Sequence, residues 1–138
     1  MVLGKGPLEP PSHPAFAYGG FVSEEKKARA YGSALALCQP SVNESFSMTL
    51  MESWLAGRPG LVHGECPVTR GHVERSKGGL WYRTYDEFAG AVTWLRTHPA
   101  LAARMGSNGR RYVSANYAWD TIVARFERLV RRWEGEGA

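Results

Sequence analysis

Two glutamates, eight positions apart, are the residues best suited to do chemistry in this chain. Glu44 follows the segment 40–43, and Glu52 lies in an apolar segment that we predict to be a helix from about Phe46 to Ala56. At ~1.5 Å of rise per residue, the two carboxylates stand roughly 12 Å apart. Carboxylate pairs that flank one glycosidic bond lie about 5–9.5 Å apart. This pair therefore suits the two ends of an elongated ligand.

The start of the same helix offers a third group. Its first-turn N–H groups, from about Phe46 to Met48, have no partner inside a helix and form a site for phosphate oxygens. A sugar hydroxyl at Glu44, a diphosphate at the helix start and a ribose at Glu52 fit this order, because carboxylates accept hydrogen bonds from paired hydroxyls. A glutamate at a helix start is also a common cap, and one in mid-helix is often a solvated surface residue. Spacing alone leaves both interpretations open.

Alternating short strands and helices must position these residues. The pattern predicts an α/β domain with a mainly parallel sheet, in which ligands collect at the carboxyl ends of the strands. The polar segment 64–77 is predicted to be irregular. The predicted strands are 1–4, 15–18, 34–39, 61–63 and 79–82, and the predicted helices are 24–32, 46–56, 85–96, 99–115 and 118–133.

Composition favours one globular domain over residues 1–138. Hydrophobic residues make up 43% and charged residues 22% of the 138 residues, which is typical of globular proteins. No apolar run approaches the ~20 residues of a membrane span, and no signal stretch opens the chain, so we predict a cytoplasmic location. Neither cysteine belongs to a CxxC pair, and the histidines lack ligand spacing, so we predict reduced thiols and no metal. Cys66 is expected to lack a helix N-terminus that would activate it.

The net charge of +4 suits an anionic ligand. Arg110, Arg111 and four arginines near the C-terminus supply much of the excess. The last predicted helix has an apolar stripe at helical spacing, so we expect it to dock on the core with a solvated basic face. A peripheral contact with anionic lipid at the inner membrane surface is the alternative for this helix.

Several motifs in this chain occur together and in a fixed order. Glu-x7-Glu, between Pro40-Ser41 and Ala56-Gly57-Arg58-Pro59, resembles the C-terminal domain of family 4 glycosyltransferases, the glycosyl transferases group 1. Four further segments resemble the same family, and the likeness covers nearly the whole chain. They are Gly20-Phe21-Val22-Ser23-Glu24-Glu25-Lys26, Gly78-Gly79-Leu80-Trp81-Tyr82, Ser107-Asn108-Gly109-Arg110-Arg111-Tyr112 and Tyr117-Ala118-Trp119-Asp120.

The resemblance implies a GT-B fold, in which two Rossmann-like domains face each other and this chain is most of the second. It implies a retaining enzyme that transfers a hexose from a nucleoside diphosphate sugar to a glycan or lipid-linked acceptor, with no metal or other cofactor. It places Glu44, the candidate catalytic residue, at the donor-sugar hydroxyls and Glu52 at the ribose. Val22 would lie near the base. The segment that would meet sugar and phosphate comprises Ser45, Phe46, Ser47 and Met48.

The chain departs from the family at three points. The family usually has Gly where Ser47 stands, and a side chain there can crowd the donor sugar. The family's acceptor domain and its basic pair for the diphosphate lie upstream of these residues, so we expect an N-terminally truncated domain that is inactive alone. An exposed sheet edge would then favour a homo-oligomer. Lys5, between two glycines, is interpreted as a solvated loop residue rather than a substitute for that pair.

Three functions remain as hypotheses. The first is the donor-binding half of a glycosyltransferase. The second is a non-catalytic nucleotide- or sugar-binding module. The third and weakest is a basic nucleic-acid-binding domain; the scattered tryptophans do not alternate with basic residues as in single-strand binders, so we expect no nucleic acid partner.

Overall fold

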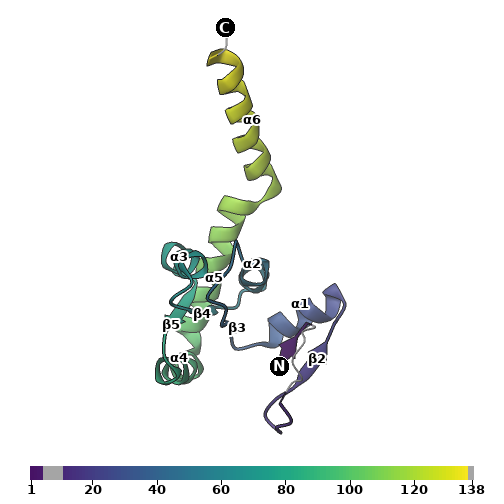
Figure 1. The fold of residues 1–138 in the computed structure, drawn as a ribbon, viewed down its shortest axis with the longest axis vertical. Coiled ribbons are helices and arrows are strands. Elements are labelled where there is room, and N and C mark those ends of the chain that lie inside the picture. Colours follow the sequence, from purple (N-terminus) through teal and green to yellow (C-terminus); the bar gives the residue numbers. More distant parts are fainter. Residues whose placement is uncertain (5–10, 137–138) are drawn as a thin grey trace.

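The computed structural model describes residues 1–4 and 11–136, and Lys5 lies outside them. The alternation of strands and helices confirms the α/β class, with parallel strands flanked by helices (Figure 1). The elements in chain order are β1 (Val2–Leu3), β2 (Tyr18–Gly20), α1 (Glu24–Ser33), β3 (Leu37–Gln39), α2 (Met48–Leu55), β4 (Gly60–His63), α3 (Pro67–Ser76), β5 (Gly79–Tyr82), α4 (Tyr85–Thr97), α5 (Pro99–Tyr117) and α6 (Trp119–Glu136).

The strands form two separate parallel sheets. In the larger one, β4 lies between β3 and β5, and Leu61 is the register partner of both Cys38 and Leu80. In the smaller one, β1 pairs with β2. The second strand was predicted at 15–18 but lies at Tyr18–Gly20, where Gly20 ends it with a positive φ of 63°. The larger sheet therefore positions the segment that carries Glu44 and Glu52.

Helices α2 and α5 pack against each other around Trp54. The Trp54 side chain is fully buried, and its indole N–H donates to the Gly78 carbonyl at 2.7 Å. A side chain at Gly106 would collide with the Gly57 carbonyl, and one at Gly109 would collide with the Trp54 ring. The close approach of α5 to α2 therefore requires glycine at both positions.

Helix α3 was missed by the sequence analysis, which predicted irregular chain over 64–77. Pro67 stands at the first helical position, and Lys77 ends the helix with a left-handed φ of 54°. The N-cap, Cys66, makes no side-chain cap hydrogen bond. Without a capping side chain, and with few apolar residues, the segment gave no helix signal.

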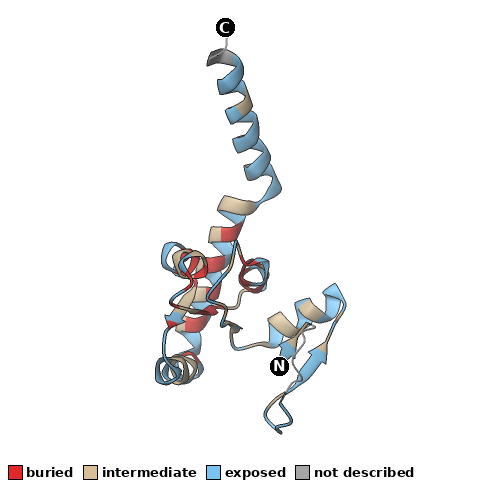
Figure 2. Cartoon of the chain, viewed as in Figure 1, coloured by how far each residue is buried: buried red, intermediate tan, exposed pale blue. Residues whose placement is uncertain are grey.

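Helix α6 does not dock on the core as predicted. It projects from the body, and most of its residues are exposed (Figures 1 and 2). Ala118 adopts an extended conformation between α5 and α6, which redirects the chain away from the body. The predicted apolar stripe consists of Ile122, Val123, Phe126, Leu129, Val130 and Trp133. All of these except the half-buried Val130 are 41–69% exposed.

Within residues 1–4 and 11–136, no helix combines the length and apolar character needed to cross a membrane.

Candidate functional site

The loop after β3 carries Glu44 at the carboxyl end of a parallel strand, where open sheets place their ligands. Pro40 follows the last residue of β3, and the chain remains non-helical as far as Ser47. The Gln39 side-chain amide donates to Oε1 of Glu44. Gln39, which the sequence analysis did not single out, therefore restrains this carboxylate from the end of the strand.

A shallow cavity of about 370 Å³ opens beside this loop. Glu44 and Ser45 line it from one side, and Pro67 at the start of α3 lines it from the other. The remaining lining residues are Val42 and Asn43. The cavity thus lies between the loop after β3 and the N-terminus of the helix that the sequence did not reveal.

Cys66 occupies a different environment from the one predicted. It is the N-cap of α3 and is fully buried, so it does stand at a helix N-terminus. Burial alone would raise the pKa of its thiol, but nearby polar groups of Thr69, Val68 and Glu44 outweigh burial and lower that pKa. The Cys66 thiol therefore lies near both the first turn of α3 and the backbone of Glu44.

Helix α2 begins at Met48, two residues later than predicted. The Leu50 N–H donates to the Ser47 carbonyl at 3.1 Å, and the Met51 N–H to the same oxygen at 3.4 Å. The free first-turn donors are therefore those of Met48 and Thr49 rather than Phe46 to Met48. Because residues 44–47 are not helical, the separation of roughly 12 Å expected from helical rise does not apply to Glu44 and Glu52.

Ser47 has a left-handed backbone with φ 68° and ψ 75°. Glycine has no Cβ and adopts this region most readily. The conformation therefore gives a physical reason why glycine was expected at this position. The Ser47 side chain is buried, and its hydroxyl lies 3.3 Å from that of Thr49. The hydroxyl therefore packs at the helix start where a glycine would leave space.

Phe46 is anchored by an aromatic cluster from α3 and α5. Its ring meets His72 at 5.5 Å and Tyr117 at 4.9 Å between centroids, both edge-on. His72 is buried on α3 rather than in a surface loop. Burial and the nearby Arg75 charge lower the pKa of His72. The Arg75 guanidinium donates to Nδ1 of His72 at 3.2 Å, so His72 is neutral with its proton on Nε2.

Glu52 faces α1 rather than open solvent. Its Oε1 lies 2.9 Å from the Lys27 ammonium, and its Oε2 accepts a hydrogen bond from the Tyr31 hydroxyl at 3.1 Å. Hydrogen bonds to Glu24 and then Glu52 raise the pKa of Lys27. Burial, followed by the Glu52 charge, raises the pKa of Tyr31 to about 12. Neither Lys27 nor Tyr31 stood out in the sequence, because they lie 25 and 21 positions before Glu52.

Val22 lies between β2 and α1, directly before the α1 N-cap Ser23, and is half-buried. It therefore stands at the start of the helix that contacts Glu52. The structure brings Glu44 and residues 45–48 together at the end of β3, and connects Glu52 to α1.

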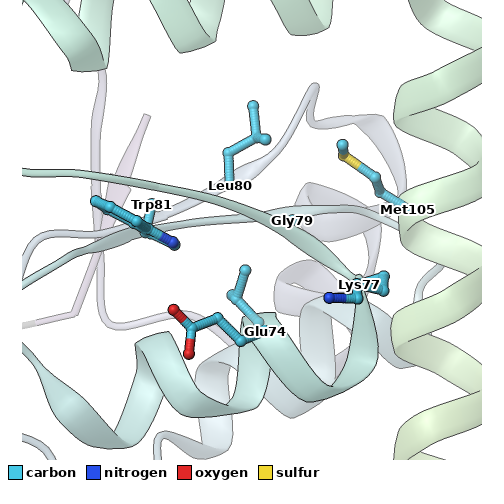
Figure 3. A pocket seen from close by; sticks show the side chains of 7 residues that line it. Glu74, Lys77, Gly79, Leu80, Trp81 and Met105 are labelled. Carbon is cyan, nitrogen blue, oxygen red and sulfur yellow. The ribbon is translucent and has the colours of Figure 1, made fainter.

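A second depression of about 390 Å³ lies between α3, β5 and α5 (Figure 3). Glu74 borders it from α3, Lys77 from the C-cap of α3, Trp81 from β5 and Met105 from α5. The Arg70 guanidinium lies 5.0 Å from the centre of the Trp81 ring. None of the residues predicted to bind the donor lines this depression. Across the described ranges, no three His, Cys, Asp or Glu side chains are grouped so that they could hold a metal ion.

The known proteins that resemble this chain include two glycosyltransferases and a sucrose-phosphate synthase. Glycosyltransferase 1 domain-containing protein 1 of Xenopus tropicalis is 27% identical over 104 residues, which are 75% of this chain and 30% of that protein. The D-inositol 3-phosphate glycosyltransferase of Streptomyces avermitilis is 33% identical over 107 residues, 75% of this chain and 22% of that protein. A sucrose-phosphate synthase from Thermosynechococcus elongatus shares the fold, with a TM-score of 0.74 and 24% identity over 87% of this chain and 30% of that one.

The chain thus spans less than a third of the length of each of these proteins. The family described as Glycosyl transferases group 1 matches residues 15–112. This match includes β2 to β5, the loop with Glu44 and all of α2. Because it covers well over half of the 138 residues, the chain belongs to the glycosyl transferases group 1 family.

Proposed function

We propose that this chain binds a nucleoside diphosphate sugar and forms the donor side of a retaining hexosyltransferase. The observation that carries the proposal is the arrangement of Glu44 and α2. Glu44 lines a cavity at the end of β3, and the free N–H groups of Met48 and Thr49 begin α2 a few residues later. The sugar would lie at Glu44, the diphosphate at the start of α2, and the ribose at Glu52.

The chemistry follows from this arrangement. Transfer breaks the bond between the anomeric carbon and the diphosphate, and negative charge develops on the departing phosphate. The N-terminus of α2 stabilises that charge through its free N–H groups and its helix dipole. The acceptor hydroxyl bonds to the anomeric carbon on the face that the diphosphate leaves, and its proton passes to the leaving group. Glu44 holds the sugar hydroxyls during this step.

The names of relatives suggest which donors and acceptors to try first. A Mycobacterium tuberculosis relative, 33% identical over 64% of this chain, is named as a GDP-mannose-dependent mannosyltransferase for phosphatidylinositol monomannoside. A hexose donor and a glycan or lipid-linked acceptor are therefore part of the proposal. The acceptor side is expected to come from a second domain of the whole enzyme.

A titration followed by ligand-observed NMR tests the proposal. UDP, GDP, UDP-glucose and GDP-mannose are added to the wild-type chain, to Glu44→Gln and to Glu52→Gln. Glu52→Gln should weaken every nucleotide that binds. Glu44→Gln should weaken only the sugar nucleotides, and should bring them to the affinity of the free diphosphates.

Glu134→Gln, which changes an exposed glutamate on α6, serves as the matched control and should bind like the wild-type chain. If the folded chain binds none of the four nucleotides, or if both site variants bind like the control, the proposal is wrong. Oligonucleotide binding that falls steeply with salt, without nucleotide binding, would favour a basic nucleic-acid-binding domain instead.

A further inference from the structure

Both carboxylate oxygens of Glu52 are contacted from α1. Lys27 reaches Oε1 at 2.9 Å, and the Tyr31 hydroxyl donates to Oε2 at 3.1 Å. The two donors lie one helical turn apart on α1, so they approach Glu52 from the same helix face. These two contacts from a separate element restrict the orientation of the Glu52 carboxylate.

The contacts leave acceptor capacity on Glu52. An ionised carboxylate has about four lone-pair positions, about two on each oxygen. Lys27 and Tyr31 use one position on each oxygen, so about one remains on each. The Glu52 side chain is 28% exposed, which leaves those positions accessible. Two acceptors at the spacing of one carboxylate match the 2′- and 3′-hydroxyls of a ribose, which are two adjacent donors.

Lys27 also offsets the negative charge that Glu52 places on α2. Its ammonium contacts Glu24 at 2.8 Å as well as Glu52, and both contacts raise its pKa, so it stays protonated throughout the physiological pH range. A bare Glu52 carboxylate would repel a diphosphate bound at the N-terminus of its own helix. The Lys27 ion pair reduces this repulsion and keeps Glu52 an acceptor for the ribose.

We propose that Lys27 and Tyr31 are positioning residues that orient Glu52 to select a ribose over a deoxyribose. The proposal rests on the proposed function, because it assigns a role within the same donor site. Neither residue touches the reacting atoms; both act through Glu52.

The test compares affinities for UDP and GDP with those for their 2′-deoxy analogues. In the wild-type chain, the ribose form should bind more tightly by roughly 10- to 150-fold, the range expected for a lost hydrogen bond to a charged group. Tyr31→Phe removes only the hydroxyl, and Lys27→Met removes the ammonium group with its charge and its hydrogen bond to Glu52. Each variant should bring the ratio close to one, mainly by weakening the ribose form. Lys27→Arg keeps a donor to Glu52 and should restore part of the preference.

Two controls separate positioning from folding. Lys26→Met changes an exposed neighbour on α1, and Glu24→Gln removes the other partner of Lys27. Both should keep the wild-type ratio, and thermal unfolding should show all variants folded. A ratio that stays at the wild-type value in Tyr31→Phe and Lys27→Met overturns this inference alone. Tighter binding by these variants overturns it too, because the contacts would then block the site. No nucleotide binding by the wild-type chain overturns the proposed function.

Discussion

The body of the molecule and its N-terminal region are held together in different ways. Every buried residue of the described chain lies between Ser47 and Val113, in the body formed by β3 to β5 and α2 to α5 (Figure 2). The described residues up to Ser33 contain none. This N-terminal region of β1, β2 and α1 meets α2 through Lys27 and Tyr31 at Glu52, and Arg58 donates to the Gly32 carbonyl.

The two kinds of attachment predict different rigidity for the two ends of the proposed donor site. Glu44 and the start of α2 belong to a packed body, where side chains interlock and small volume changes are felt. Val22 belongs to a region attached through partly exposed polar contacts, which contribute little free energy. We therefore expect the sugar and phosphate end to be fixed and the base end to be adjustable.

The largest effect on the free energy of unfolding should come from adding a methyl group where α2 and α5 approach each other closely. In Gly109→Ala the added methyl group would meet the Trp54 ring. Overpacking of this kind destabilises by about 1–3 kcal/mol. Gly90→Ala on α4 is the matched control, since open space surrounds that position, and it should stabilise by about 0.5–1 kcal/mol. Urea unfolding measures both, and equal free energies of unfolding for the two variants would contradict the packing that defines the body.

Ser47→Gly should stabilise the body by up to about 1 kcal/mol, because a non-glycine residue with a left-handed backbone costs roughly that much. Ser47→Ala removes the hydroxyl but keeps the backbone cost, so it should not stabilise. Thermal unfolding distinguishes the two. A gain of stability in Ser47→Ala as well would show that the buried hydroxyl, and not the backbone, is responsible.

A smaller, pH-dependent effect on stability is expected at His72, which contacts the Phe46 ring. Arg75, Tyr112 and Tyr117 surround His72, and its pKa is lowered in the folded chain. The unfolded chain therefore takes up this proton first. The contribution of neutral His72 to the free energy of unfolding is fully present above the ordinary histidine pKa of about 6.5. It is lost as pH falls toward the folded-state pKa. Urea midpoints at about pH 7.5 and about pH 5.5 should differ less in His72→Gln than in the wild-type chain.

The smallest effect on stability belongs to the contacts of the N-terminal region. Lys27 and Glu52 are each about a quarter exposed, so Lys27→Met should change the free energy of unfolding by at most about 1 kcal/mol. Added salt should reduce even that difference, because it screens exposed charges. A loss comparable to that of Gly109→Ala would show that the N-terminal region stabilises the body. It would contradict the inference that this region is attached only weakly.

Local signals in the sequence predicted most elements well. Ser23 accepts a hydrogen bond from the Lys26 N–H at the start of α1, and Thr84 with Glu87 forms a capping box at the start of α4. Both helices begin at the predicted residues. Helix α3 has no such side-chain cap, and the start of α2 depends on the left-handed Ser47. These two were therefore the helices that the sequence missed or misplaced.

The amino-acid sequence was enough to predict the parallel α/β fold and the order of the elements. It also placed Glu44 and Glu52 around one helix start. These features follow from hydrogen bonds between near neighbours and from the order of motifs. Only the tertiary structure decided what surrounds them. It brought Lys27 and Tyr31 to Glu52, placed Cys66 at the start of α3 beside the Glu44 backbone, and left the apolar face of α6 exposed. These contacts join residues distant in the chain, so they depend on how the elements pack.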